Sequence, residues 1–161
     1  MNRPATPSEP GTSGHPPPGA ATIVALHLCP GPRSRSVLWR VERVTAIADR
    51  GLEGDRNARA GSDRQVLLVE QEVLEALDLK PGAIREQVTV RGLGLDALAP
   101  GTRLRAGTAV LAIEQVCDPC RRMDEVRPGL MELLEGRRGR FARVVEGGAI
   151  AVGDALVIET G

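Results

Sequence analysis

The first part of the folded region carries the hydrophobic pattern of β-strands. Residues 23–29 form a β-favouring run that ends at the Pro-Gly-Pro of residues 30–32. Apolar and polar side chains then alternate over residues 37–41, and the alternation resumes with shifted parity over residues 44–48. A bulge or bend in one long strand would produce this shift. The pattern therefore predicts a curved strand, which fits a barrel.

The middle of the chain predicts a long loop, a buried strand and one helix. Residues 51–61 are rich in Gly and charge and show no periodicity, which indicates a loop. Long loops inside a domain are often functional. Residues 64–69 have the composition of a short buried strand, and residues 70–77 place their apolar side chains on one helical face.

The second half of the chain predicts further short strands and two helical pieces. Pro128 and Gly129 divide residues 121–135 into the two pieces. The predicted strands span residues 87–90, 103–106, 108–116, 141–145 and 155–158. Many short strands with little helix favour a mostly β, single-domain barrel with short helical insertions.

Length and composition define the domain organisation. A chain of 161 residues has room for one domain. Residues 1–20 hold six of the twelve prolines and no apolar pattern. We therefore expect a disordered Pro/Gly-rich tail over residues 1–20 and one domain over residues 21–161.

Charge and aromatic content argue against two classes of partner. The chain has 21 basic and 21 acidic residues, so its net charge does not suggest a nucleic-acid partner. Trp39 and Phe141 are its only aromatic residues, too few for a base-stacking surface. No apolar run approaches the roughly 20 residues that span a bilayer. We expect a soluble, cytoplasmic protein with neither nucleic-acid nor membrane partners.

The strongest chemical motif is Cys117-Asp118-Pro119-Cys120-Arg121-Arg122. Guanidinium groups beside a thiol stabilise the thiolate, which is the form that attacks sulfur and binds metal. Two ordinary buried cysteines in a turn would fit the same motif, because one C-x-x-C is weakly specific. A zinc site would need His27 and Cys29 to complete a Cys3His set, whereas Cys29 in an apolar strand is expected to be a small buried residue. A thioredoxin-like role lacks the βαβ setting.

Two further clusters contain polar groups. The charged residues between Gly51 and Arg64 could hold an anion through bidentate arginine contacts, or could pair with one another on a solvated loop. Residues 82–87 place polar side chains at the entrance of a predicted strand, either as site groups or as turn residues. Taken alone, each cluster leaves both interpretations open.

The three clusters together, in this order, resemble the MOSC domain family, named for the C-terminal domain of molybdenum cofactor sulfurases. The resemblance covers roughly residues 22–159, and the matching elements are Gly51-Leu52-Glu53-Gly54-Asp55-Arg56, Arg64-Gln65-Val66, Gly82 with Arg85-Glu86-Gln87-Val88-Thr89, Leu98-Ala99-Pro100-Gly101 and Pro119-Cys120. Asn57 and Gln87 depart from the family pattern, which often has His and Asn at these positions.

The resemblance implies a molybdenum-pterin cofactor as the small-molecule ligand. Cys120 is the reactive residue that it implies, as a persulfide carrier or as a ligand of molybdenum. Cys117 is a second candidate ligand, a resolving thiol or a packing residue. The predicted cofactor-binding residues are Asp55, Arg56, Arg64, Gln65, Glu86, Gln87, Arg121 and Arg122.

The resemblance suggests two enzymatic activities. These are sulfur transfer for the maturation of metal–sulfur cofactors and molybdenum-dependent reduction of N-hydroxylated compounds. The chain shows no pyridoxal-phosphate site, dinucleotide fingerprint or iron–sulfur cysteine set. A sulfurtransferase-like enzyme would need a separate cysteine desulfurase, and an oxidoreductase would need an electron-donor protein. The alternatives are a non-catalytic molybdopterin-binding or carrier module and a zinc-stabilised structural protein.

Overall fold

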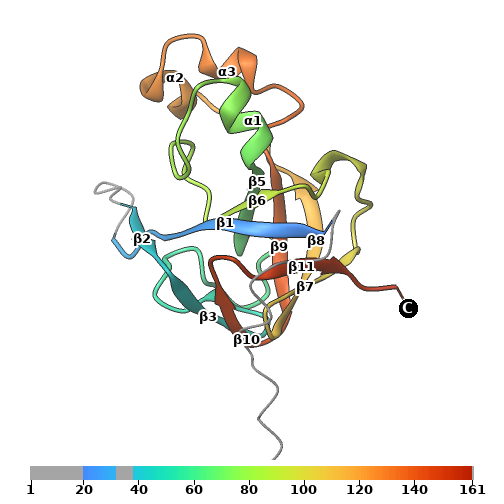
Figure 1. The fold of residues 1–161 in the computed structure, drawn as a ribbon. Helices are drawn as coiled ribbons and strands as arrows, with labels where there is room; N and C mark the ends of the chain where they lie inside the picture. Colours follow the sequence, from blue (N-terminus) through green and yellow to red (C-terminus); the bar gives the residue numbers. More distant parts are fainter. Residues whose placement is uncertain (1–19, 32–37, 161) are drawn as a thin grey trace, which may run out of the picture.

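Seven strands close into a barrel (Figure 1). The structure is a computed structural model that describes residues 20–31 and 38–160. The ring closes where β11 pairs with β1. In order around the ring the strands are β11 (Ala155–Ile158), β7 (Arg103–Ala106), β8 (Ala109–Val116), β9 (Arg140–Glu146), β5 (Val66–Glu70), β6 (Val88–Arg91) and β1 (Ala21–Leu28). The mostly β barrel predicted from the sequence is confirmed.

The parity shift near residue 42 marks a change of sheet. The strand before it pairs with β1, while the strand after it joins a separate three-stranded sheet below the barrel (Figure 1). The four strands involved are β2 (Trp39–Val41), β3 (Arg43–Ile47), β4 (Gly51–Leu52) and β10 (Gly148–Ala151). The predicted curved strand is therefore two strands joined by a bend, and residue 37 lies outside the described residues.

Two of these strands differ from the sequence expectation. Gly51 and Leu52, assigned to a loop, form β4, which pairs with the end of β3. The prediction of a loop from residue 51 was wrong for these two residues, because the backbone of β3 forms strand hydrogen bonds with them. The sequence pattern predicted no strand at the position of β10. The predicted tail lies outside the described residues apart from Ala20.

Three short helices lie together at one end of the barrel (Figure 1). They are α1 (Gln71–Ala76), α2 (Arg122–Val126) and α3 (Leu130–Leu133). Gly129, with a φ of 84°, separates the last two, which confirms the two helical pieces predicted around it. In the described part of the chain no helix is long and apolar enough to cross a membrane.

A parallel crossover brings residues 82–87 to this end of the barrel. β5 and β6 pair in parallel, so the chain between them must cross over, and α1 lies in that connection. The turn after α1 then returns to β6, where the carbonyl oxygen of Gln87 accepts a 2.8 Å hydrogen bond from the His27 amide of β1.

Two hydrophobic clusters fill the molecule. The larger one is the barrel interior, with Leu26, Leu68 and Leu111 among its members. The smaller one lies beneath the helices, where Leu74, Met123 and Leu130 pack against the outer face of β5. Cys117 belongs to this second cluster. The segment that follows β8 is therefore held between the barrel and the helices.

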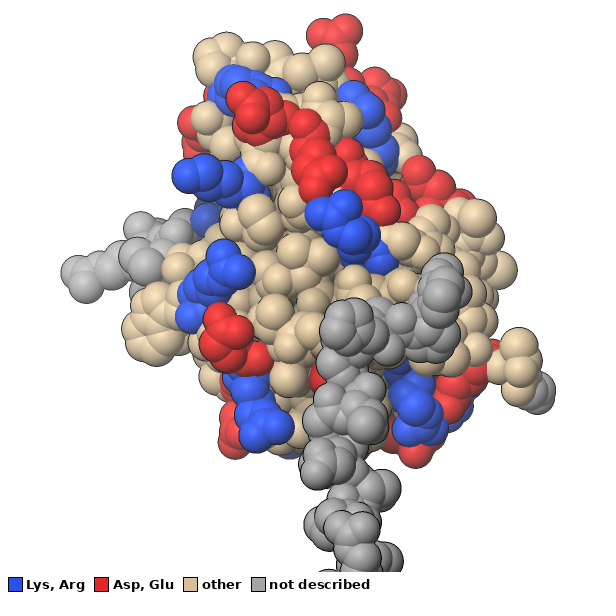
Figure 2. Space-filling model, viewed as in Figure 1, with Lys and Arg blue, Asp and Glu red and all other residues tan. Residues whose placement is uncertain are grey.

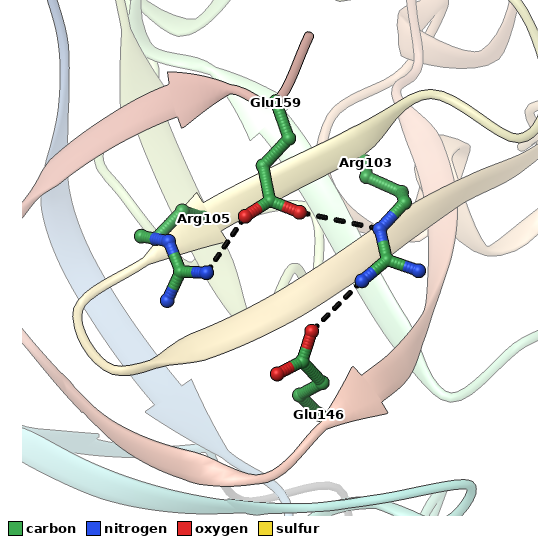
Figure 3. Close-up of polar contacts among 4 residues, drawn as sticks. All are labelled: Arg103, Arg105, Glu146 and Glu159. Carbon is green, nitrogen blue, oxygen red and sulfur yellow. Dashed lines mark hydrogen bonds and ion pairs between the residues drawn. The ribbon is translucent and has the colours of Figure 1, made fainter. Parts of the chain in front are cut away.

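Arginines on the side of the barrel pair with carboxylates (Figure 3). Arg103 contacts Glu146 at 2.8 Å and Glu159 at 3.2 Å, and Arg105 contacts Glu159 at 2.7 Å. These side chains are partly exposed, so each pair contributes little to stability. The pairs nevertheless neutralise the positive charge on this side of the barrel.

Candidate functional site: an arginine-lined cleft around Cys120

A cleft of about 660 Å³ opens where the barrel meets the helical end. Five segments line it: the loop after β4, strand β5, the turn before β6, the chain from the end of β8 into α2, and the chain from residue 138 into β9. Seven arginines line the cleft, and no described acidic residue does. They are Arg56, Arg59, Arg64, Arg85, Arg121, Arg122 and Arg138.

No ion pair among the described residues neutralises the arginines of this arginine cleft, in contrast to Arg103 and Arg105 on the barrel side. Arg138 is only 6% exposed, yet its Nε and Nη1 atoms are buried without a hydrogen-bond partner. The same two atoms of Arg56 are also buried and unpaired. Buried guanidinium donors without partners are costly, so the arrangement favours an anionic ligand.

Arg85 is partly buried beside other cationic side chains and has an unusual backbone conformation. Burial lowers the pKa of Arg85, and the neighbouring charges of Arg56 and Arg122 lower it further, while the Cys29 thiol acts in the opposite direction. Its Nη2 lies 3.7 Å from the sulfur of Cys29. The backbone of Arg85 has a φ of 69°, a conformation that non-glycine residues rarely adopt. Such backbone strain is often found at binding sites.

The two cysteines of the motif have different surroundings. Both line the cleft, but Cys117 is 7% exposed, whereas Cys120 is exposed and free. Burial raises the pKa of Cys117, and the positive charges of Arg138 and Arg64 partly oppose this effect. The Cys117 amide donates to the Gly139 carbonyl at 2.9 Å, which fixes the start of the segment. Cys120 is therefore the thiol that a ligand can reach.

Phe141 forms an apolar part of the wall beneath Arg64. The guanidinium carbon of Arg64 lies 5.4 Å from the centre of the Phe141 ring. Cations within about 6 Å of a ring centre are attracted to its face. This contact holds the exposed Arg64 side chain over the cleft.

Two predicted cofactor-binding residues lie behind the cleft wall. Asp55 is 5% exposed, and its carboxylate accepts hydrogen bonds from the Cys29 amide at 2.8 Å and from the Asn57 amide and Gln87 Nε2 at 3.0 Å each. Gln65 accepts from the Val144 amide at 2.9 Å and donates to a loop carbonyl. Both side chains tie the charged loop to the barrel.

Glu86 and Gln87 also form buried hydrogen bonds. Gln87 lines the cleft, but its Oε1 accepts from the Leu67 amide at 2.8 Å and its amide group donates to Asp55. Glu86 accepts from the Gly82 amide at 2.9 Å and the Thr89 hydroxyl at 3.0 Å. Burial raises the pKa of Glu86, opposed by those hydrogen bonds and by the charge of Arg138.

The structure therefore divides the predicted site residues into two groups. The residues that line the cleft are Arg56, Arg64, Gln87, Cys117, Cys120, Arg121 and Arg122. The other three, Asp55, Gln65 and Glu86, form hydrogen bonds within the surrounding structure.

A zinc set around the motif does not form. In the described ranges, no three His, Cys, Asp or Glu side chains are placed to hold a metal ion. His27 and Cys29 are both buried, and burial, with the charge of Arg40, lowers the pKa of His27. The expectation that Cys29 is a small buried residue is confirmed at 3% exposure.

Arg138 was not singled out by the sequence. It is one of several arginines between residues 121 and 143, and only the adjacent Gly139 distinguishes it in the sequence from its neighbour Arg137. Arg137 donates to the Leu133 carbonyl, whereas Arg138 is buried beside Cys117. The adjacent Gly139 was the available signal, because a Cβ there would meet the Leu68 carbonyl oxygen. A glycine that allows two backbones to approach indicates that its neighbours are closely packed.

Comparisons with known proteins identify the fold and the family. The structure is similar to the YuaD protein of Bacillus subtilis, with a TM-score of 0.72 and 22% identity over 85% of this chain and 94% of that one. It is also similar to YiiM of Geobacillus stearothermophilus, with a TM-score of 0.69 and 23% identity over 87% and 75% of the two chains. A comparison with curated protein sequences found no match. The model of the MOSC domain matches residues 55–157, and the chain therefore belongs to the MOSC domain family.

Proposed function

We propose that the arginine cleft binds the phosphate-bearing molybdenum-pterin cofactor and that Cys120 is the thiol that ligates the metal or carries sulfur for it. One observation supports this proposal above the others: an exposed thiol lies among seven arginines that have no carboxylate partners in the described residues. A phosphate needs guanidinium or backbone donors, and molybdenum accepts soft thiolate ligands.

The residues of the cleft fit such a group. The unpaired buried donors of Arg138 and Arg56 would receive hydrogen-bond acceptors from the phosphate. Arg64 would position the ligand from its place over Phe141. Asp55 and Gln87 would keep the charged loop in place without contacting the metal. When bound, the cofactor would supply the redox or sulfur chemistry.

Two activities are compatible with this site, and each requires a different partner. Sulfur transfer would use a separate cysteine desulfurase that delivers sulfur to Cys120. Reduction of N-hydroxylated compounds would use an electron-donor protein. A carrier module would bind the cofactor and show neither activity. All three share the same cofactor site, so cofactor retention is the property to test first.

The test is elemental and mass analysis of protein purified from a host that makes the molybdenum cofactor. We expect molybdenum or an additional sulfur atom in the wild-type chain and in Cys29→Ser. Cys120→Ser should lose both and keep its melting transition, because serine is neither a soft ligand nor a sulfur acceptor. Retention by Cys120→Ser, with loss in Cys117→Ser, would assign the role to the other sulfur.

A further inference from the structure

We propose that the arginine cleft also accepts small sulfur oxyanions of the thiosulfate class as direct sulfur donors to Cys120. The chain would then load sulfur without a donor protein. This inference rests on the proposed role of Cys120 as a sulfur-carrying thiol. It extends that role by naming the chemical class of the donor.

The charge of the cleft favours a compact dianion. The side chains of Arg138 and Arg56 line the cleft, and each has two buried donor atoms without a partner. A sulfonate group offers three acceptor oxygens, and a guanidinium fork can bind two acceptors side by side. Because no described acidic residue lines the cleft, no negatively charged side chain in its walls repels a dianion.

The charge distribution around the Cys117–Cys120 segment is one-sided. A second pocket, of about 450 Å³, includes Asp118 and Pro119 from the middle of this segment. Four carboxylates line it: Asp118, Asp124, Glu132 and Glu135. Acidic side chains also form a band over the helical end on the face shown in Figure 2. An anion is therefore attracted to the segment from the arginine side and repelled from the other.

The transfer step is balanced without any further reactant. The Cys120 thiolate attacks the outer, sulfane sulfur of thiosulfate, and a bond forms between the two sulfur atoms. The sulfur–sulfur bond of thiosulfate breaks, and its electron pair leaves with sulfite. Cys120 then carries a persulfide, and sulfite leaves as a dianion. If Cys120 begins as the thiol, its proton is released to solvent.

The surroundings of Cys117 would preserve the product. A thiolate at this position could attack the persulfide and form a disulfide with Cys120. Cys117 is only 7% exposed, and its thiol donates toward the Asp118 carbonyl oxygen at 3.8 Å, a contact that favours the thiol over the attacking thiolate. The loaded persulfide should therefore persist until an external nucleophile removes its sulfur.

The experiment uses the full chain, reduced and produced in a host without the molybdenum cofactor. Incubation with thiosulfate should add one sulfur atom at Cys120, detected by mass spectrometry of the intact and digested protein. Addition of cyanide should remove that sulfur as thiocyanate and allow turnover. Cys120→Ser should show neither event.

Matched arginine variants test the anion site itself. Arg138→Gln should lower kcat/KM for thiosulfate by about tenfold or more, because a charged donor is lost from the ligand. Arg137→Gln is the control, because its side chain donates to the Leu133 carbonyl outside the cleft. Each thiosulfate rate is divided by the rate of alkylation of Cys120 by iodoacetamide, a neutral reagent, so that a change in the thiolate fraction is corrected and only the loss of anion binding remains. If Arg138→Gln fails to fold, the double variant Arg121→Gln/Arg122→Gln removes two exposed charges instead.

The outcomes separate this inference from the proposed function. Equal thiosulfate activity in the Arg138 and Arg137 variants, or no sulfur on Cys120 at all, would overturn the inference. If Cys120 still retains molybdenum in that case, the proposed cofactor site stands. If Cys120→Ser also retains molybdenum, the proposed role of the thiol fails as well.

Discussion

Replacing Asp55 with asparagine should destabilise the fold while leaving all seven arginines of the cleft in place. The carboxylate accepts three hydrogen bonds, one at Oδ1 from Cys29 and two at Oδ2 from Asn57 and Gln87. Asparagine keeps one acceptor oxygen, which can face Asn57 and Gln87, but its amide group then faces the Cys29 amide. One charge-assisted hydrogen bond is lost, its buried donor is left unpaired, and the other two bonds become neutral, so the free energy of unfolding should fall by about 2–4 kcal/mol.

Urea unfolding at pH 7 measures this change. Most small domains have a total stability of about 5–15 kcal/mol, so a loss of this size is easily detected. Asp49→Asn is the matched control. Asp49 is exposed, accepts one bond from the Gly61 amide at 3.3 Å, and has a φ of 55°, which asparagine tolerates. Its effect should be within about 0.5 kcal/mol.

A specific result would refute this reasoning about Asp55. If Asp55→Asn unfolds within about 1 kcal/mol of the wild-type chain, its hydrogen bonds do not hold the charged loop. If it also loses most of its cofactor affinity, Asp55 is a ligand-contacting residue, as predicted from the family resemblance.

Three further predictions concern single residues near the cleft. Arg64→Lys should weaken cofactor binding and leave the melting temperature nearly unchanged, because lysine keeps the charge but loses the planar group over Phe141; a change in stability alone would make Arg64 structural. Burial lowers the pKa of His27 below its ordinary value of 6.5, so His27 is neutral in the folded state at pH 7. Stability should therefore fall as the pH decreases from 6.5 through that lower pKa, and His27→Gln should flatten this part of the urea-unfolding profile; an unchanged profile would contradict the assignment. Gly82→Ala should cost about 1–3 kcal/mol of unfolding free energy, because its Cβ would lie 2.7 Å from His27 Nε2 and its φ is +89°; a stability equal to that of the wild-type chain would show that the histidine ring moves away freely.

Much of the barrel could be predicted because its strands are buried on one face. Apolar alternation is a local signal, and it located β7 and β9 to within a few residues. β10 gave no such signal. It begins at the second of two adjacent glycines and becomes a strand by pairing with β3, about a hundred residues earlier in the chain. Pairing between distant segments cannot be inferred from the composition of either one.

The site was predictable by residue type but not by role. The family motif directed attention to Asp55 and Gln65, but their hydrogen-bond partners Cys29 and Val144 lie 26 and 79 residues away in the sequence. Only the fold shows that these polar groups are buried together. Arg138 shows the opposite: the motif does not include it, yet the fold buries it in the cleft wall two residues before β9.

The unpaired arginines also have a kinetic consequence. The chain as a whole has zero net charge, so its distant electrostatic field is weak. Close to the cleft the seven guanidinium groups act together, and such a site can accelerate the capture of anions by 10–1000-fold, as an order of magnitude. The Debye length is only about 8 Å at physiological ionic strength, so this acceleration acts over the last few ångströms of approach. The association rate of dianions should therefore fall steeply with added salt, whereas the rate for a neutral ligand of the same size should not change.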